Sequence, residues 1–297
     1  MAQLLHLEPN GITVPFRKMF QMLLHPAQYE LKGNVPALVE LLKAYMGKPG
    51  TGPESTLAVV VPHLQAVLGV WQKLCCSKAT EMHALNMLEV IVNSVPLNAY
   101  APMLGQIMGI LIQRLLKVKG MRFKYLFIPT FLFMIGKIGS APVITSVEGL
   151  KNGMFATLLS QVLLPNVAKI PGTHERKNCL VGLCSLAGQS EQHMRSPTFK
   201  SVAVDVVKCL ASLVSSKDPC AKVKDEEDDG TAEIAYNSNS GFSRLSFATS
   251  KKSDPFPNIK ADSALITQSL MRLNQLVPGV IDASGVRDIL RGAGMQV

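Results

Sequence analysis

The cysteine and histidine side chains are the groups in this sequence that could act most directly as nucleophiles or metal ligands. Cys184 lies in Gly182-Leu183-Cys184-Ser185-Leu186-Ala187-Gly188, which superficially resembles the turn that carries a hydrolase nucleophile. The spacing differs from that motif and the surrounding pattern is helical, so we interpret Cys184 as a core residue. The chain has no Cys-x-x-Cys pair, and its six histidines include no His-x-x-x-His pair that could hold zinc.

Three further patterns resemble a phosphate-binding loop, a calcium loop and a membrane-dimer motif, but each has a simpler structural interpretation. The glycine-rich stretch from Gly47 to Gly52 lacks the Gly-Lys-Ser/Thr of a phosphate-binding loop, so it is expected to be a connection. The acidic run from Asp225 to Asp229 lacks the alternating spacing of a calcium loop and is interpreted as solvated charge. Gly105-x-x-x-Gly109 matches a membrane-dimer motif, but close packing between helices of a stack explains it equally well. The sequence therefore predicts no catalytic residue, no metal ligand and no cofactor.

The basic residues between positions 114 and 124 are the strongest candidates for contact with a partner. They are Arg114, Lys117, Lys119, Arg122 and Lys124, in a chain whose formal net charge is +9. Such a charge favours anionic partners. One interpretation is a solvated turn whose cations stabilise the C-terminus of a helix. The alternative is an electropositive face for an acidic protein, which we favour over nucleic acid because no exposed aromatic residues are expected among the cations.

One helical segment occurs twice in similar form, forty residues apart, and this repeat indicates how the candidate residues are positioned. The segment from Val61 to Leu74 is echoed by the segment from Ala101 to Leu115, with the prolines and most apolar positions in register. A proline is tolerated in the first turn of a helix, because an N–H there would have no intrahelical acceptor. A recurrence of about forty residues is typical of helical-pair repeats, which bury their faces by stacking on neighbours.

Helical periodicity recurs along the rest of the chain, and no sustained alternation typical of strands is present. Asn34 and Ser196 are candidate caps that precede prolines, and Met121 to Ile138 is apolar on nearly every side, as expected for a helix between neighbours. The most apolar stretch, Tyr125 to Ile135, is about half as long as the roughly 20 residues that a transmembrane helix needs, so buried helices and no membrane span are expected. The cysteines are expected to be reduced and mostly buried, and no secretory signal is recognised at the N-terminus. The predicted class is all-α.

The stretch from 218 to 260 interrupts the helical pattern. It is acidic and then serine-rich, and its low hydrophobicity predicts an insertion that buries little surface. We therefore divide the chain into repeats at 1–217, the insertion at 218–260 and terminal capping helices at 261–297. Within the insertion, Phe242, Arg244 and Phe247 are candidate partner-binding residues. The two phenylalanines could instead hold the insertion against the helices.

Several short segments match those of a known protein family, and they occur in the same order along the chain. They are Gly33–Val39, Val70–Leu74, Leu163–Pro165, Lys177–Leu183 and Phe242–Ala248, with Lys251-Lys252 and Asp254-Pro255 behind the last. From about Phe20 to the C-terminus the chain resembles the exportin-2 family, the importin-alpha re-exporters of the importin-beta superfamily, also called cellular apoptosis susceptibility proteins. The resemblance covers only about the last third of that family's length, without its amino-terminal Ran-binding domain. The sequence is therefore expected to be a fragment, a truncated gene product or a short paralogue.

The resemblance implies a HEAT-repeat α-solenoid, a right-handed, armadillo-like superhelix of antiparallel helix pairs. It implies a non-enzymatic receptor that exports importin-alpha together with Ran-GTP and shuttles between nucleus and cytoplasm across the nuclear envelope. Ran contact would be indirect, and nuclear pore components would be further partners. Neither nucleic acid binding nor membrane insertion is implied. The alternative that the residues leave open is a helical-repeat scaffold that binds another acidic protein and has no transport activity.

Overall fold

The computed structural model describes residues 1–9, 11–48, 52, 55–189, 197–215, 254–259 and 262–292. Every regular element in these ranges is helical, which confirms the predicted all-α class. The described chain divides into two compact units. Unit 1 comprises Met1–Pro102, and unit 2 comprises the described parts of Met103–Asp225 and Asp254–Val297.

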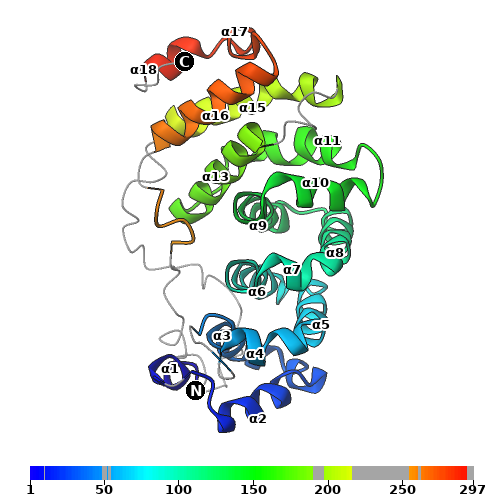
Figure 1. Ribbon diagram of the computed structural model, residues 1–297. Helices are drawn as coiled ribbons and strands as arrows, with labels where there is room; N and C mark the ends of the chain where they lie inside the picture. The colour runs from blue at the N-terminus through cyan, green and yellow to red at the C-terminus, as the bar shows by residue number, and fades with distance from the viewer. Residues whose placement is uncertain are drawn as a thin grey trace. The chain divides into compact units, whose positions relative to one another are not determined.

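Unit 1 is built from helices that pack on both sides of a central helix, α6. Its elements are α1 (Ala2–Leu7), α2 (Val14–Leu23), η1 (Pro26–Tyr29), η2 (Lys32–Asn34), α3 (Val35–Met46), α4 (Thr56–Val59), η4 (Val61–His63), α5 (Leu64–Cys75), α6 (Glu81–Ser94) and α7 (Leu97–Tyr100). Helix α6 packs against α3 and α5, and α3 also packs against α1 and α2 (Figure 1). The side chains of Trp71 and Tyr45 are fully buried in this core. This arrangement is the packing expected of stacked helical pairs.

The two prolines of the repeated segment occupy the same local structure. Pro62 lies in the 3-10 turn η4, and Pro102 lies in the 3-10 turn η5 (Ala101–Met103). In each case the α-helix begins two residues later, at Leu64 or Leu104, rather than at the proline itself. Asn34 precedes α3 as predicted, but its side chain makes no capping hydrogen bond. The candidate cap Ser196 lies outside the described residues.

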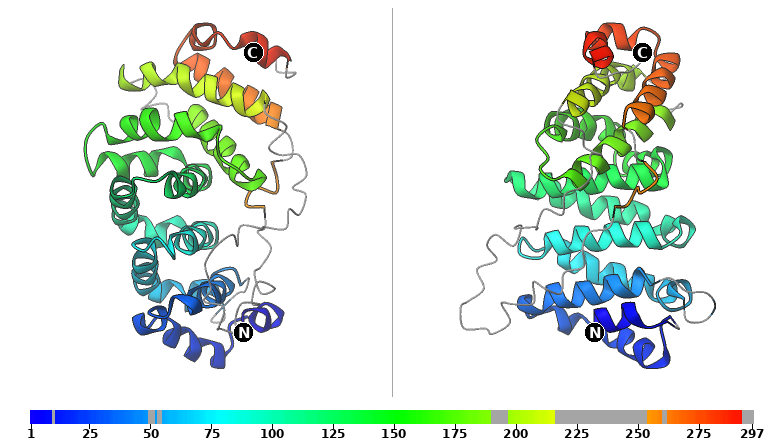
Figure 2. Two further views of the ribbon diagram at one scale, coloured as in Figure 1. Left: turned by 180° about the vertical axis from the view of Figure 1, so that it is seen from behind. Right: turned by 90° about the vertical axis from the view of Figure 1, so that its left-hand side faces the viewer.

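Unit 2 is built around α13, which packs against helices from both ends of the unit's sequence. Its elements are α8 (Leu104–Lys117), α9 (Met121–Ile138), α10 (Ser140–Glu148), α11 (Met154–Leu158), the π-helix η6 (Leu159–Leu163), α12 (Leu164–Val167), α13 (Thr173–Gln189), α15 (Pro197–Ser215), α16 (Asp262–Leu276), α17 (Val280–Ser284) and α18 (Arg287–Gly292). Helix α13 packs against α9, α15 and α16, and α15 and α16 lie side by side (Figure 2). The chain on either side of the predicted insertion therefore contributes to one core.

Helix α9 confirms the prediction of a helix enclosed by neighbours. Ten of its residues between Phe123 and Ile135 are buried, and it packs against α8, α10, α12 and α13. Phe123, Phe127 and Phe131 recur every four residues, so their rings lie one above another along one face, with centroids 6.2 and 5.2 Å apart. Pro129 lies inside this helix and removes one backbone donor.

Helices α9 and α13 approach each other closely at Gly182. A Cβ atom built on Gly182 would lie only 2.2 Å from the carbonyl oxygen of Leu132. The interpretation of Gly105-x-x-x-Gly109 as a close packing site is wrong. A Cβ on Gly105 would meet nothing within 4 Å, and one on Gly109 would meet only the Leu150 side chain at 3.6 Å. The glycine that permits backbone contact is thus the one on α13.

One stretch of the described chain, Thr56–Cys75, is long and apolar enough by composition to cross a membrane. It consists of α4, the proline-containing turn η4 and α5. Val60, Val67 and Trp71 of this stretch are fully buried inside unit 1. Because a core helix of a folded domain has the same composition, packing inside unit 1 is sufficient to explain the apolar sequence.

The described cysteines differ in exposure. Cys75, Cys179, Cys184 and Cys209 are buried, Cys76 is exposed, and none of these five forms a disulfide. Burial raises the pKa of the Cys209 thiol to about 12. Burial of Cys184 within α13 supports its interpretation as a core residue. Cys220 lies outside the described residues.

Among these five cysteines, we expect Cys76 to react first with a maleimide under native conditions. Its modification should be at least about tenfold faster than that of the buried four, whose reaction requires local opening of their helices. Mass spectrometry of peptides after timed labelling would measure this, with labelling in urea as the control in which all rates converge. Equal rates in the native protein would contradict the burial of these side chains.

Candidate binding surfaces

The five cations predicted as a partner-binding run lie where α8 ends and α9 begins, and we call this set the basic corner. It comprises Arg114, Lys117, Lys119, Arg122 and Lys124. Helix α8 ends at Lys117, and α9 begins at Met121 after a three-residue connection. Lys117, Lys119 and Arg122 are exposed, whereas Arg114 and Lys124 are half-buried. The sequence-predicted residues are therefore brought together by a single helix-to-helix connection.

Arg114 differs from the other cations of the basic corner. Its guanidinium carbon lies 5.8 Å from the centroid of the buried Phe123 ring, a distance typical of a cation–π contact. Arg114 and Lys117 also occupy the last turn of α8, where a cation stabilises the partial negative charge of the helix C-terminus. For these two residues a structural role accounts for the charge.

The candidate partner-binding residues of the insertion, Phe242, Arg244 and Phe247, lie outside the described residues. A buried aromatic residue nevertheless lies a short way downstream of them. Phe256 is buried, and it belongs to the described segment 254–259, which lies inside the stretch predicted as the insertion. The placement of this segment in unit 2 identifies residues that the sequence analysis did not select.

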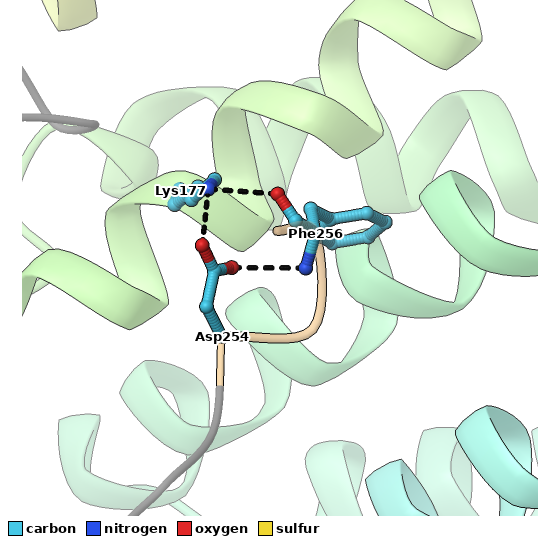
Figure 3. Close-up of polar contacts among 3 residues, drawn as sticks. All are labelled: Lys177, Asp254 and Phe256. Carbon is cyan, nitrogen blue, oxygen red and sulfur yellow. Dashed lines mark hydrogen bonds and ion pairs between the residues drawn. The ribbon is translucent and has the colours of Figure 1, made fainter. Parts of the chain in front are cut away.

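Phe256 is held by a polar arrangement that we call the clasp, made of Lys177, Asp254 and Phe256 (Figure 3). The Lys177 ammonium donates to Asp254 Oδ2 at 2.5 Å and to the Phe256 carbonyl oxygen at 2.9 Å. The Phe256 backbone N–H donates to Asp254 Oδ1 at 2.9 Å. Lys177 is only 4% exposed, so its ammonium group has lost most of its hydrogen bonds to water. The hydrogen bonds to Asp254 and Phe256 replace them.

The Phe256 ring fits a pocket formed by α9 and α13. It meets the Phe133 ring edge-on with centroids 5.8 Å apart, and Lys137 Nζ lies 4.9 Å from its centroid. Gly136 makes room for the ring, because a Cβ there would lie 3.0 Å from Phe256 Cζ. The clasp thus fixes the chain to unit 2 where it returns from the insertion. The only sequence signal was Asp254-Pro255-Phe256, an apolar ring after a long stretch of low hydrophobicity.

The electrostatics of the clasp favour the ionised carboxylate. Partial burial alone would raise the pKa of Asp254, but hydrogen bonds from Lys177 and the Phe256 N–H outweigh it and hold the pKa below its ordinary value. The positive charges of Lys177 and His174 act in the same direction. Burial lowers the pKa of the neighbouring Lys137, although Asp254 opposes that change. The clasp is therefore formed most completely above the acidic range.

The fold and these surfaces define a helical-repeat protein. Its identifiable features are the basic corner and the buried Phe256 side chain of the clasp. Within the described residues no group of three or more His, Cys, Asp or Glu side chains could hold a metal ion. A surface made of helix connections is suited to contact other macromolecules.

Comparison with known proteins defines the family. The profile of the CAS/CSE protein C-terminus matches residues 1–291. Exportin-2 of Danio rerio is 29% identical over 280 residues, and that of Homo sapiens is 29% identical over 284; each match covers 94% of this chain and 28% of the relative. The solved exportin Cse1 in its cargo-free, cytoplasmic state superimposes with a TM-score of 0.76 at 24% identity, covering 99% of this chain and 29% of that one.

The chain belongs to the CAS/CSE family and corresponds to the family's C-terminal part. It spans 28% of the length of the exportin-2 relatives that it matches. The likeness to Cse1 confirms the predicted helical-repeat solenoid fold. The resemblance noted from the sequence is thereby confirmed at the level of the family.

Proposed function

We propose that this chain serves nuclear transport as the C-terminal, cargo-contacting part of an export receptor. The observation that carries the proposal is the family match, which extends over residues 1–291 and has relatives named exportin-2. A stack of helical pairs presents connections and helix ends along its sides, which suits contact with another folded protein. The chain acts by binding and performs no catalysis.

The proposed cargo is importin-alpha, bound together with the GTP form of Ran. The formal net charge of +9 favours acidic partners and steers their approach. Because the chain spans 28% of its relatives, its Ran contact is expected to depend on the amino-terminal part of a longer receptor. The protein would shuttle between nucleus and cytoplasm and would meet nuclear pore components at the nuclear envelope.

A capture experiment tests this function. The immobilised chain is incubated with importin-alpha and Ran carrying a non-hydrolysable GTP analogue, with and without the amino-terminal part of exportin-2 added as a separate polypeptide. We expect importin-alpha to be captured when all components are present and to be lost when Ran carries GDP. The GDP sample is the control for non-specific charge attraction.

Failure to capture importin-alpha in every combination would contradict the proposal. In that case the remaining function of the fold would be that of a scaffold for a different acidic protein. The nucleotide on Ran distinguishes the two functions, because an export receptor should capture importin-alpha only with the GTP form, whereas charge attraction to a scaffold should not depend on that nucleotide.

A further inference from the structure

One half of the clasp is a short segment whose shape is fixed largely by its own hydrogen bonds. Residues 254–259 form no helix or strand. Asp254 Oδ1 accepts from the Phe256 N–H two positions later, as in an Asx turn, and Pro255 between them has a restricted φ. A second turn follows, because the Ile259 N–H donates to the Phe256 carbonyl oxygen at 3.1 Å. A free peptide of this sequence should therefore adopt much of the same shape before it binds, at a small entropy cost.

The other half of the clasp is a site on α9 and α13, which we call the motif site. Its members are Phe133, Gly136 and Lys137 of α9 and Lys177 and Val181 of α13. The buried Lys177 ammonium pairs with the Asp254 carboxylate, although an apolar residue would serve packing alone at lower cost (Figure 3). A Cβ on Gly136 would lie 3.0 Å from Phe256 Cζ and 3.1 Å from Val181 Cγ1, so glycine leaves the space that the ring fills. The motif site therefore selects a carboxylate and an aromatic ring two residues apart.

The chain's own segment leaves two polar atoms of α13 without partners. His174, Lys177 and Asn178 recur at i, i+3 and i+4 along α13, so their side chains share one face of the helix. The positive charge of His174 acts on Asp254, which places that face beside the clasp. His174 Nδ1 and Asn178 Oδ1 are buried, and neither has a hydrogen-bond partner among the described residues. Because buried polar atoms without partners are costly, this face has capacity for further hydrogen bonds with a ligand.

We infer that the motif site recognises a short segment of a partner protein with the sequence Asp-x-Phe, and that residues 254–259 are its competing occupant within this chain. The partner's carboxylate pairs with Lys177, its ring enters the space beside Gly136, and N–H groups that flank its motif donate to Asn178. The chain's own copy is tethered closely, because α16 begins at Asp262, so its local concentration is in the millimolar range or above. The partner displaces it by making hydrogen bonds that the chain's own segment does not make.

The test requires a chain whose motif site is vacant. Asp254→Ala combined with Phe256→Ala removes both recognised groups and leaves α9 and α13 unaltered, and we call this chain the emptied variant. The probe is a labelled peptide with the sequence of residues 253–259, and fluorescence anisotropy measures its binding. We expect the emptied variant to bind the peptide at least about tenfold more tightly than the intact chain, in which the tethered copy competes. Circular dichroism verifies that the emptied variant is folded.

Matched peptides and two further substitutions identify the contacts. Peptides in which asparagine replaces the aspartate, or alanine replaces the phenylalanine, should each bind the emptied variant about tenfold more weakly. Adding Lys177→Met to the emptied variant should abolish the difference between the aspartate and asparagine peptides, because the charge that distinguishes them then has no partner. Extending the peptide by alanines at both ends should raise its affinity about threefold, and Asn178→Leu should remove that gain. A purely structural role of the clasp would produce none of these differences.

Hydrogen exchange of the intact chain gives a second measurement that does not depend on the emptied variant. Excess unlabelled peptide should displace the tethered copy, whose Phe256 and Ile259 amides are hydrogen-bonded in the clasp. We expect their exchange to become at least about threefold faster when the peptide is added, and to stay unchanged with the peptide that lacks the phenylalanine.

The inference would be overturned if the folded emptied variant bound no peptide, or bound the peptides with and without the phenylalanine equally. It would also be overturned if polyglutamate or inorganic phosphate competed as well as the peptide, since the site would then respond to charge alone. Unchanged exchange of the intact chain at saturating peptide would likewise contradict displacement. The inference is independent of importin-alpha capture: peptide binding without capture would contradict the proposed function alone, and capture without peptide binding would contradict this inference alone.

Discussion

Replacing Gly182 with valine is expected to reduce the unfolding free energy of unit 2 by about 3 kcal/mol or more, because the helices α9 and α13 must separate to admit the side chain. Even the Cβ of such a side chain would lie 2.2 Å from the Leu132 carbonyl oxygen and 2.7 Å from its carbonyl carbon. Both are backbone atoms, so no rotamer change relieves the overlap. Hydrogen exchange of amides in α9 and α13, read by mass spectrometry, would measure the loss of protection.

Gly109→Ala provides the matched control within unit 2. Gly109 lies inside α8, and an added Cβ would meet only Leu150 Cδ2 at 3.6 Å, an ordinary van der Waals distance. Alanine favours a helix interior over glycine by roughly 0.5–1 kcal/mol, so this variant should be neutral or more stable. If Gly182→Val retained wild-type protection, the close contact between α9 and α13 would not be an energetic constraint.

The comparison of these two glycines shows which part of the fold the sequence could predict. The apolar character of Met121–Ile138 on nearly every side predicted α9 correctly, because the hydrophobicity of one segment is a local property. The close approach at Gly182 depends on the backbone of Leu132, fifty positions earlier in the chain, and no local pattern specifies it. Gly105-x-x-x-Gly109 matches a known helix-packing motif, whereas Gly182 belongs to no such motif. The two glycines of the motif nevertheless have more space around them than Gly182 has.

The same distinction applies to the candidate surfaces. The basic corner was visible in the sequence because its five cations lie within eleven consecutive residues, Arg114 to Lys124. The sequence did not show that Arg114 is partly covered by its contact with Phe123, or that Leu116 beside it is exposed, since both depend on packing. The clasp joins Lys177 to Asp254 across 77 positions, and a lone lysine inside a helical pattern gives no indication of such a partner.

Replacing Asp254 with asparagine is expected to reduce the unfolding free energy of unit 2 by about 2–3 kcal/mol, because it leaves the buried Lys177 ammonium without an opposite charge. The Asp254 side chain is itself 32% exposed, which moderates the loss. The Phe256 carbonyl would remain as an acceptor for Lys177, so the segment 254–259 should loosen before α13 unfolds. Hydrogen exchange should therefore show the first loss of protection at Phe256 and Ile259.

The pH dependence of the clasp has a definite sign. The pKa of Asp254 is lower in the folded protein than its ordinary value, so the folded state binds its proton less readily than the unfolded state. The stability that this contributes is fully present above the ordinary pKa of about 4 and is lost as the pH falls through the lowered value. Wild-type protein should lose this part of its stability on acidification, whereas Asp254→Asn should show a smaller change over the same range.

The control for Asp254→Asn is the exposed ion pair of the same unit. Asp282 Oδ1 lies 2.7 Å from Arg287 Nη2, with side chains that are 62% and 42% exposed. Water solvates both charges, so Asp282→Asn should cost less than about 1 kcal/mol. Similar losses in the two variants would mean that burial of Lys177 adds nothing to its interaction with Asp254. A larger loss for Asp254→Asn, confined at first to residues 254–259, would establish that this carboxylate fastens the chain to α13 where it leaves the insertion.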